Sequence, residues 1–138
     1  MTNFEVIPHT ADIRIHTFGD SLEELFESAL TGLCELIYHQ FRLDEQNANF
    51  ETNIEIQSVD DTMLLIDFLS EALTIMHQNK VLLPFLNIKY LNNHKIIASI
   101  KGNYVEEFHE DVKAVTYHEA QIKFNDNNIF ETMIVFDI

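Results

Sequence analysis

Apolar residues recur at steps of three and four in two stretches of the chain, the spacing that lines side chains along one face of a helix. The first stretch opens with a capping-box pattern, in which Ser21 is the predicted N-cap and Glu24 stands three residues on. The second begins after Asp60, Asp61 and Thr62. The predicted buried positions are Leu22, Leu25, Phe26, Ala29, Leu30, Leu33, Cys34 and Ile37, then Leu64, Leu65, Phe68, Leu69, Ala72, Leu73 and Met76.

Elsewhere apolar and polar residues alternate with a period of two, which is typical of half-exposed strands. The Asn-rich segments 91–94 and 125–128 predict turns, because Asn tolerates the left-handed conformation, and the last two strands form a hairpin. We predict an α+β fold in which two helices pack on a mainly antiparallel β-sheet, within a single domain spanning residues 1–138. The predicted strands are Asp12–Thr17, Phe50–Gln57, Phe85–Tyr90, Ile96–Lys101, Val112–Phe124 and Ile129–Asp137.

The charge of the chain narrows the classes of partner. With 8 basic and 23 acidic residues the formal net charge is −15, so we expect no direct contact with nucleic acid, whose phosphates are bound by Lys and Arg. The abundance of apolar residues (46%) excludes an intrinsically disordered chain in spite of that charge. Divalent cations and basic protein surfaces are the partners that such acidity favours.

Signals for export, for a membrane and for common enzymes are missing from the sequence. There is no basic and apolar leader and no long apolar run, so we expect a cytoplasmic protein without a membrane segment. The three glycines form no phosphate-binding loop, and no H-E-x-x-H or G-x-S-x-G motif occurs. Cys34 lies on an apolar helix face, which favours an inert buried thiol over a nucleophile.

Two acidic positions, near opposite ends of the chain, are candidate metal ligands. Asp12 closes the segment His9–Asp12 at the entry to a strand, where it serves either a turn or a pocket. Asp137 and the α-carboxylate of Ile138 stand at the end of the final apolar strand. If the fold joins them, these oxygen donors suit Ca²⁺, Mg²⁺ or Mn²⁺. The alternative is that both ends are solvated surface, since the spacing alone does not bring the residues together.

A third polar cluster occupies residues 111–119. Alternation places Lys113, Val115 and Tyr117 on one strand face, where Lys113 and Tyr117 either meet a partner or are simply solvated. His118 falls on the other face, and we interpret it as a hydrogen-bonded histidine in or near the core in preference to a ligand or general base.

Four segments together resemble the archease family, in order and spacing along essentially the whole chain. They are His9–Ile13, Phe18–Phe26, Val112–His118 and Phe136–Ile138, of which the first and third are the most specific in combination. Arg14 is a departure, since the family usually carries a small residue there. By motif position, the resemblance implies that Asp12 is one metal-binding carboxylate and that Asp137 with Ile138 provides the other.

The resemblance also implies a function. Archeases activate the RtcB-type RNA ligase, which joins a 2′,3′-cyclic phosphate or 3′-phosphate end to a 5′-hydroxyl with GTP and Mn²⁺. The activator promotes guanylylation of the ligase and hence multiple turnover in tRNA splicing or RNA repair. We therefore expect a non-catalytic, metal-binding ligase activator. A general chaperone or protein-interaction module is the alternative, and a metal-dependent hydrolase using the same carboxylates is a third hypothesis.

Overall fold

The computed structural model describes residues 3–8 and 12–138. None of the helices in these two ranges combines the length and the apolar character that crossing a bilayer requires. The elements in chain order are β1 (Asn3–Pro8), β2 (Asp12–Gly19), α1 (Leu22–Ile37), the short 3-10 helix η1 (Glu45–Asn47), β3 (Phe50–Gln57), α2 (Asp61–Asn79), β4 (Val81–Leu91), β5 (Lys95–Tyr104), β6 (Ala114–Thr116), β7 (Lys123–Phe124) and β8 (Phe130–Asp137).

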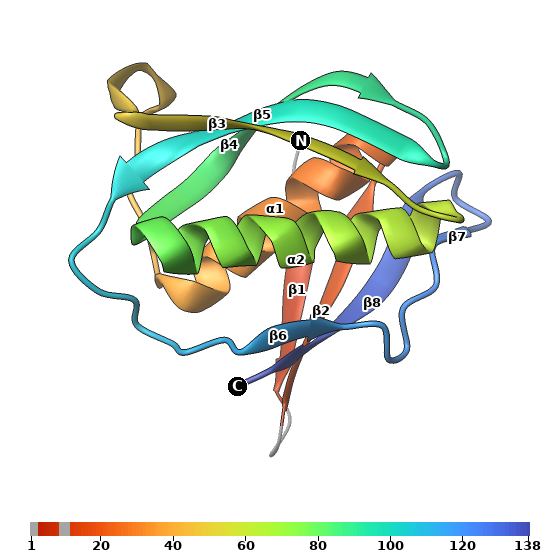
Figure 1. Cartoon of the computed structure of the whole chain (residues 1–138). Coiled ribbons are helices and arrows are strands. Elements are labelled where there is room, and N and C mark those ends of the chain that lie inside the picture. Colours follow the sequence, from red (N-terminus) through yellow and green to blue (C-terminus); the bar gives the residue numbers. More distant parts are fainter. Residues whose placement is uncertain (1–2, 9–11) are drawn as a thin grey trace.

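The strands form two antiparallel sheets. The five-stranded sheet has the order β1-β2-β8-β6, with β7 also paired to β8, and the three-stranded sheet has the order β3-β5-β4. Both helices lie between the sheets, since α1 packs against β1, β2 and β4 while α2 packs against β3, β4 and β6 (Figure 1). The predicted α+β class with two helices on antiparallel strands is confirmed, and the strands divide into two sheets around the helices.

Both helices begin at side-chain caps. Ser21 Oγ accepts a hydrogen bond from the Glu24 backbone N–H at 3.1 Å, and the Glu24 carboxylate accepts one from the N–H of Asp20, which confirms the predicted cap. The second helix is capped by Asp60, whose Oδ1 accepts from the N–H of Met63 at 2.8 Å. Acidic side chains at both starts also complement the positive end of the helix dipole.

The predicted apolar faces of the helices form the core. Every predicted face position is buried except Leu22, which is half-buried, and the rings of Phe26 and Phe68 meet between the helices with centroids 5.6 Å apart. Cys34 belongs to this core, and burial raises the pKa of its thiol far above the ordinary value. The predicted inert cysteine is confirmed, because the thiolate that would act as a nucleophile is disfavoured there.

The predicted strand Val112–Phe124 is wrong over most of its length. Only β6 and β7 at its two ends pair with β8, and a turn separates them, in which the Ala120 N–H donates to the Tyr117 carbonyl. Beyond that turn the backbone N–H groups of Gln121 and Ile122 donate to the side-chain hydroxyls of Thr132 and Thr62, which are not ladder hydrogen bonds. Apolar and polar residues alternate throughout residues 112–124, but the backbone pairing with β8 is interrupted between β6 and β7. The predicted hairpin is confirmed in the pairing of β7 with β8.

Strand β1 and His118 also differ from the predictions. Strand β1 was not predicted, and it pairs with β2 from Asn3↔Phe18 to Pro8↔Ile13 at the sheet edge. His118 is exposed, so its predicted place in or near the core is wrong. His9, Thr10 and Ala11, which belong to the motif around Asp12, lie outside the described residues.

Candidate metal centre

Asp12 and Asp137 are direct partners in the β2–β8 ladder. The antiparallel register runs from Asp12↔Asp137 to Gly19↔Phe130. Directly opposed residues of an antiparallel pair project from the same face, with Cβ atoms about 5 Å apart. The fold therefore brings the two candidate carboxylates together, which the spacing in the sequence could not show.

Asp137 is held from both sides by the sheet. It pairs with Asp12 on β2 and with Ala114 on β6, and its carbonyl oxygen accepts a hydrogen bond from the Lys113 N–H at 2.8 Å. Its side chain is exposed, and Ile138, the third predicted ligand, follows directly and is 37% exposed. The backbone of this strand end is thus ordered while its carboxylate faces solvent.

Arg14 occupies the same strand face as Asp12, two residues further along β2. Its Nη1 donates to Asp12 Oδ1 at 3.0 Å, and its Nε donates to Glu119 Oε2 at 2.7 Å. The side chains of Arg14 and Asp12 are only 19% and 21% exposed. One candidate metal ligand therefore already forms a partly buried ion pair within the chain.

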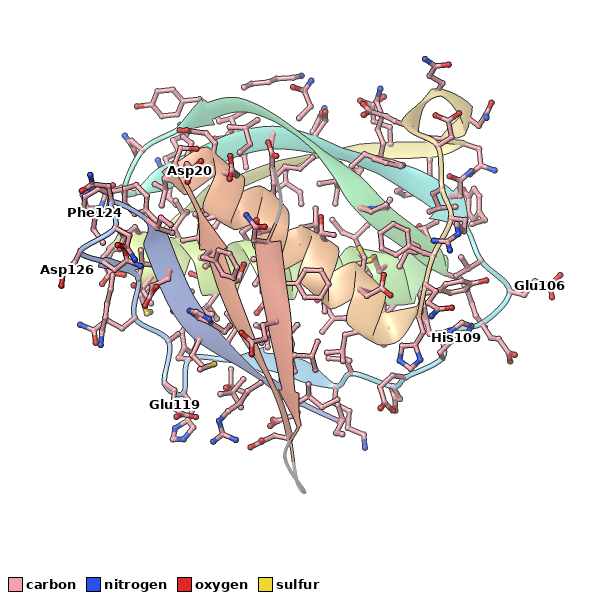
Figure 2. All side chains as sticks on the ribbon, turned by 180° about the vertical axis from the view of Figure 1, so that it is seen from behind. Asp20, Glu106, His109, Glu119, Phe124 and Asp126 are labelled. Carbon is pink, nitrogen blue, oxygen red and sulfur yellow. The ribbon has the colours of Figure 1, made fainter. Side chains whose placement is uncertain are left out.

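Glu119 reaches Arg14 from the turn between β6 and β7 (Figure 2). This turn has the Tyr117–Ala120 hydrogen bond and a positive φ of 63° at Glu119, a combination found in type II turns, where Gly or Asn is usual. Glu at this position costs backbone strain, on the order of 1 kcal/mol. Its carboxylate provides the second contact to the guanidinium.

The donor chemistry at this end of the sheet fits a hard cation. The candidates are the carboxylates of Asp12 and Asp137 and the α-carboxylate of Ile138, and oxygen donors of this kind suit Ca²⁺, Mg²⁺ and Mn²⁺. Within the described residues, no three His, Cys, Asp or Glu side chains are grouped closely enough to hold a metal ion. Two side-chain carboxylates would thus share the ion with non-side-chain oxygens and with water, as Mg²⁺ and Mn²⁺ commonly allow.

The third polar cluster lies beside this end of the sheet. Lys113 is exposed, and its backbone bonds to Asp137 as described above. The Tyr117 hydroxyl donates to Asp67 of α2, whose other carboxylate oxygen accepts from Ser58 Oγ at 2.6 Å. Tyr117 therefore anchors the β6–β7 turn to α2, a contact that the sequence did not predict.

Reasoning from sequence missed the roles of Arg14 and Glu119. The spacing of Asp12 and Arg14 by two residues in a predicted strand was a usable signal, since it puts both side chains on one face. No comparable signal marked Glu119, because the stretch around it alternates like a strand and contains neither Gly nor Pro.

Comparison with known proteins identifies relatives over the whole chain. A model of the archease protein family matches residues 4–138. The protein archease of Pyrococcus abyssi is 30% identical over 145 residues, covering 100% of both chains. That of Sulfolobus acidocaldarius is 34% identical over 147 residues, covering 98% of this chain and 99% of the relative.

Solved structures agree with these matches. The solution structure of protein 1598 from Methanobacterium thermoautotrophicum superposes with a TM-score of 0.80 at 28% identity, covering 100% of both chains. A crystal structure from Thermotoga maritima, described as an archease and possible chaperone, gives a TM-score of 0.66 at 22% identity, covering 96% of this chain and 94% of that one. The second match shows a shared fold.

Proposed function

Because this chain belongs to the archease family, we propose that it is a non-catalytic, metal-binding activator of an RtcB-type RNA-splicing ligase. It would promote guanylylation of the ligase, and hence repeated joining of RNA ends in tRNA splicing or RNA repair. One observation supports this proposal above the others: Asp12 and Asp137 are opposed at an accessible end of the β2–β8 ladder. That placement suits a site presented to a partner protein.

The charge of the chain supports action through a protein. At −15 it would be repelled by an RNA backbone, whereas a basic, Mn²⁺-containing ligase active site would attract it. Charge complementarity of this kind speeds encounter and fixes orientation more than it adds affinity. We therefore place the ligase, and not its RNA, opposite the Asp12–Asp137 end of the five-stranded sheet.

In this proposal the residues of the chain have distinct tasks. Asp12 and Asp137 hold a divalent cation (Ca²⁺, Mg²⁺ or Mn²⁺) together with the carboxylate of Ile138. When bound, the cation supplies positive charge that attracts phosphate oxygens at the ligase site. The pairing of Asp137 with both neighbouring strands fixes its backbone opposite Asp12, so that the two carboxylates start from adjacent positions.

A turnover assay tests the proposal directly. The cognate ligase is supplied with GTP, Mn²⁺ and an RNA bearing a 2′,3′-cyclic phosphate and a 5′-hydroxyl, and joined RNA is counted per ligase molecule. Adding this chain in catalytic amounts should raise that ratio well above one, and the chain alone should join or hydrolyse nothing. An unchanged ratio would contradict ligase activation, and phosphoester hydrolysis by the chain alone would favour a hydrolase.

Substitutions make this assay specific. Asp137→Asn should abolish the stimulation, whereas Asp126→Asn should not. Asp126 is exposed in the turn before β8 (Figure 2). This turn is at the other end of the eight-residue strand from Asp137, so the two residues are roughly 25 Å apart. The two variants make the same chemical change, so a difference between them isolates the candidate metal centre.

A general chaperone role is the second candidate, in line with the description of the Thermotoga maritima structure as a possible chaperone. Client binding of that kind needs a contiguous apolar patch. The exposed large apolar residues of the described chain lie on separate elements: Val6, Val59, Tyr90, Tyr104, Tyr117, Phe124 and Ile138. Suppression of aggregation of unrelated proteins that is indifferent to Asp137→Asn would favour this alternative.

A further inference from the structure

We propose that Arg14 is a tethered counter-cation that competes with a divalent metal ion for the carboxylate of Asp12, a role that rests on the metal site proposed above. The guanidinium donates to Asp12 Oδ1 at 3.0 Å from a position two residues along the same strand. Because that spacing puts both side chains on one face, Arg14 is attached next to Asp12 while its long side chain can still change position.

The charges around Arg14 make this competition unavoidable. Its guanidinium is permanently charged, and it lies among the carboxylates of Asp12 and Glu119, with Asp137 on the same sheet face. A divalent ion on Asp12 would stand within a few ångströms of the guanidinium in its present position. Two cations at that separation repel strongly at a partly buried site, so binding of the ion requires Arg14 to withdraw.

Glu119 offers Arg14 the place to which it can withdraw. The Arg14 Nε donates to Glu119 Oε2 at 2.7 Å while Nη1 contacts Asp12, so the guanidinium is shared between two carboxylates on separate segments. Arg14 can therefore release Asp12 without losing every ionic partner. The competition thus defines two metal-free states, one with Arg14 on both carboxylates, as in this structure, and one with Arg14 on Glu119 alone. Because a metal ion on Asp12 requires the second state, its apparent affinity is the intrinsic affinity multiplied by the fraction of chains in that state.

A purely structural role for Arg14 makes a different prediction. If the ion pairs serve only to tie the β6–β7 turn to β2, removing the guanidinium lowers stability and leaves metal affinity unchanged. Competition instead predicts that the same removal raises metal affinity. Metal binding by the isolated full chain therefore separates the two roles.

Mn²⁺ titration of the full chain, followed by the electron paramagnetic resonance signal of free Mn²⁺, is the test. Arg14→Gln should bind Mn²⁺ about tenfold more tightly than the native chain, the size typical of changes next to metal ligands. Adding Asp12→Asn to Arg14→Gln should remove the gain. Arg14→Lys, which keeps the positive charge, should show a smaller increase in Mn²⁺ affinity than Arg14→Gln.

Arg42→Gln is the matched control. Arg42 is the other arginine of the chain and is exposed in the segment between α1 and β3, so its loss changes net charge equally. The proposal is overturned if Arg14→Gln binds Mn²⁺ no more tightly than the native chain, including no binding by either. It is also overturned if Arg42→Gln increases Mn²⁺ affinity as much as Arg14→Gln does. The same holds if the increase in Mn²⁺ affinity remains when Asp12→Asn is added to Arg14→Gln.

A second readout uses the native chain and does not depend on a variant folding. With two arginines, the chain has two Nε–H signals in a nitrogen–proton correlation spectrum. Titration with Ca²⁺ should move the Arg14 signal and leave that of Arg42 in place, and an unmoved Arg14 signal overturns the proposal. Neither readout involves the ligase, so a chain that binds metal as expected but fails to stimulate the ligase overturns the proposed function alone.

Discussion

Asp12 and Asp137 stand directly opposite one another on β2 and β8, although they lie near the two ends of the chain. This pairing depends on the whole eight-residue register between the strands, which places half-buried Ile13 against buried Phe136 and joins Ile15 to Ile134 in the core. The core thus sets the position of the two exposed carboxylates, since a slip of one residue would move Phe136 out of the core.

Asparagine at Asp12 or Asp137 should abolish ligase stimulation and leave the fold intact. Exposed Asp137→Asn should alter the free energy of unfolding by less than about 1 kcal/mol, and Asp12→Asn, which breaks a charged hydrogen bond to Arg14, by up to about 2 kcal/mol. If both hold one ion, the double variant should be no worse than either single variant. Turnover per ligase molecule and urea unfolding measure the two quantities. Independent, additive losses of stimulation would contradict a shared site.

Stimulation of the ligase should weaken as salt rises. The net charge of −15 favours encounter with a basic partner, and this long-range attraction is screened at high ionic strength. The association rate, measured by stopped-flow mixing, should fall about tenfold or more between roughly 0.05 M and 0.5 M KCl. Ligase turnover without the chain, at the same salt concentrations, is the control. A rate that is independent of salt would contradict electrostatic steering.

The features that sequence analysis predicted well are local ones. The cap at Ser21 and the buried face through Phe26 and Cys34 follow from spacings within one helix. The alternation at residues 50–57 likewise predicted β3 to the residue. Each of these depends on neighbours a few positions away, which a single sequence displays directly.

What the sequence could not show is non-local or concerns backbone conformation. Nothing in the spacing of residues 12 and 137 specifies that they pair, because strand register depends on the whole sheet. The turn at Glu119 was missed because its positive φ occurs without the Gly or Asn that usually marks such a position. The sequence shows Arg14 as a departure from the family pattern, but its contact with Glu119 exists only because of that turn.

Alanine at Gly102 should destabilise the chain severely. Gly102 of β5 passes beneath a bulge in β4, where the register shifts between Leu82 and Phe85. A Cβ at this position would lie 1.7 Å from the Leu82 carbonyl oxygen and 2.9 Å from the Leu83 Cα, and these backbone atoms of β4 cannot move aside as a flexible side chain would. We expect a loss of at least about 2–3 kcal/mol in the free energy of unfolding, measured by urea denaturation.

Gly32 provides the control for that substitution. It lies in the middle of α1, and an added Cβ would meet side chains of Phe4 and Ile15 at 3.3 Å or more, which can adjust. Alanine is also favoured over glycine in a helix by about 1 kcal/mol, so Gly32→Ala should be nearly neutral. A similar loss for both variants would contradict the close approach at Gly102.

Phenylalanine at Tyr117 should lower stability in a way that depends on pH. The hydroxyl donates to Asp67, and this hydrogen bond raises the pKa of Tyr117, with smaller contributions from burial and from the charge of Asp67. Since the folded state favours the protonated phenol, the stabilisation is fully present below the unfolded pKa of about 10 and is lost as the pH rises through the higher folded value. Tyr117 is 53% exposed, so solvent screening limits the loss in Tyr117→Phe to about 0.5–1 kcal/mol near neutral pH.

Urea denaturation between about pH 7 and pH 11 measures this effect. The difference in the free energy of unfolding between the native chain and Tyr117→Phe should stay constant near neutral pH and vanish toward the alkaline end of this range. Tyr104→Phe is the control, because Tyr104 is exposed to a similar degree (59%) and lies on β5, away from the β6–β7 turn. If both variants follow the same pH profile, the bond to Asp67 does not anchor the turn. If only Tyr117→Phe changes with pH, that turn, and with it the carboxylate of Glu119 on Arg14, is held against α2 by the phenol.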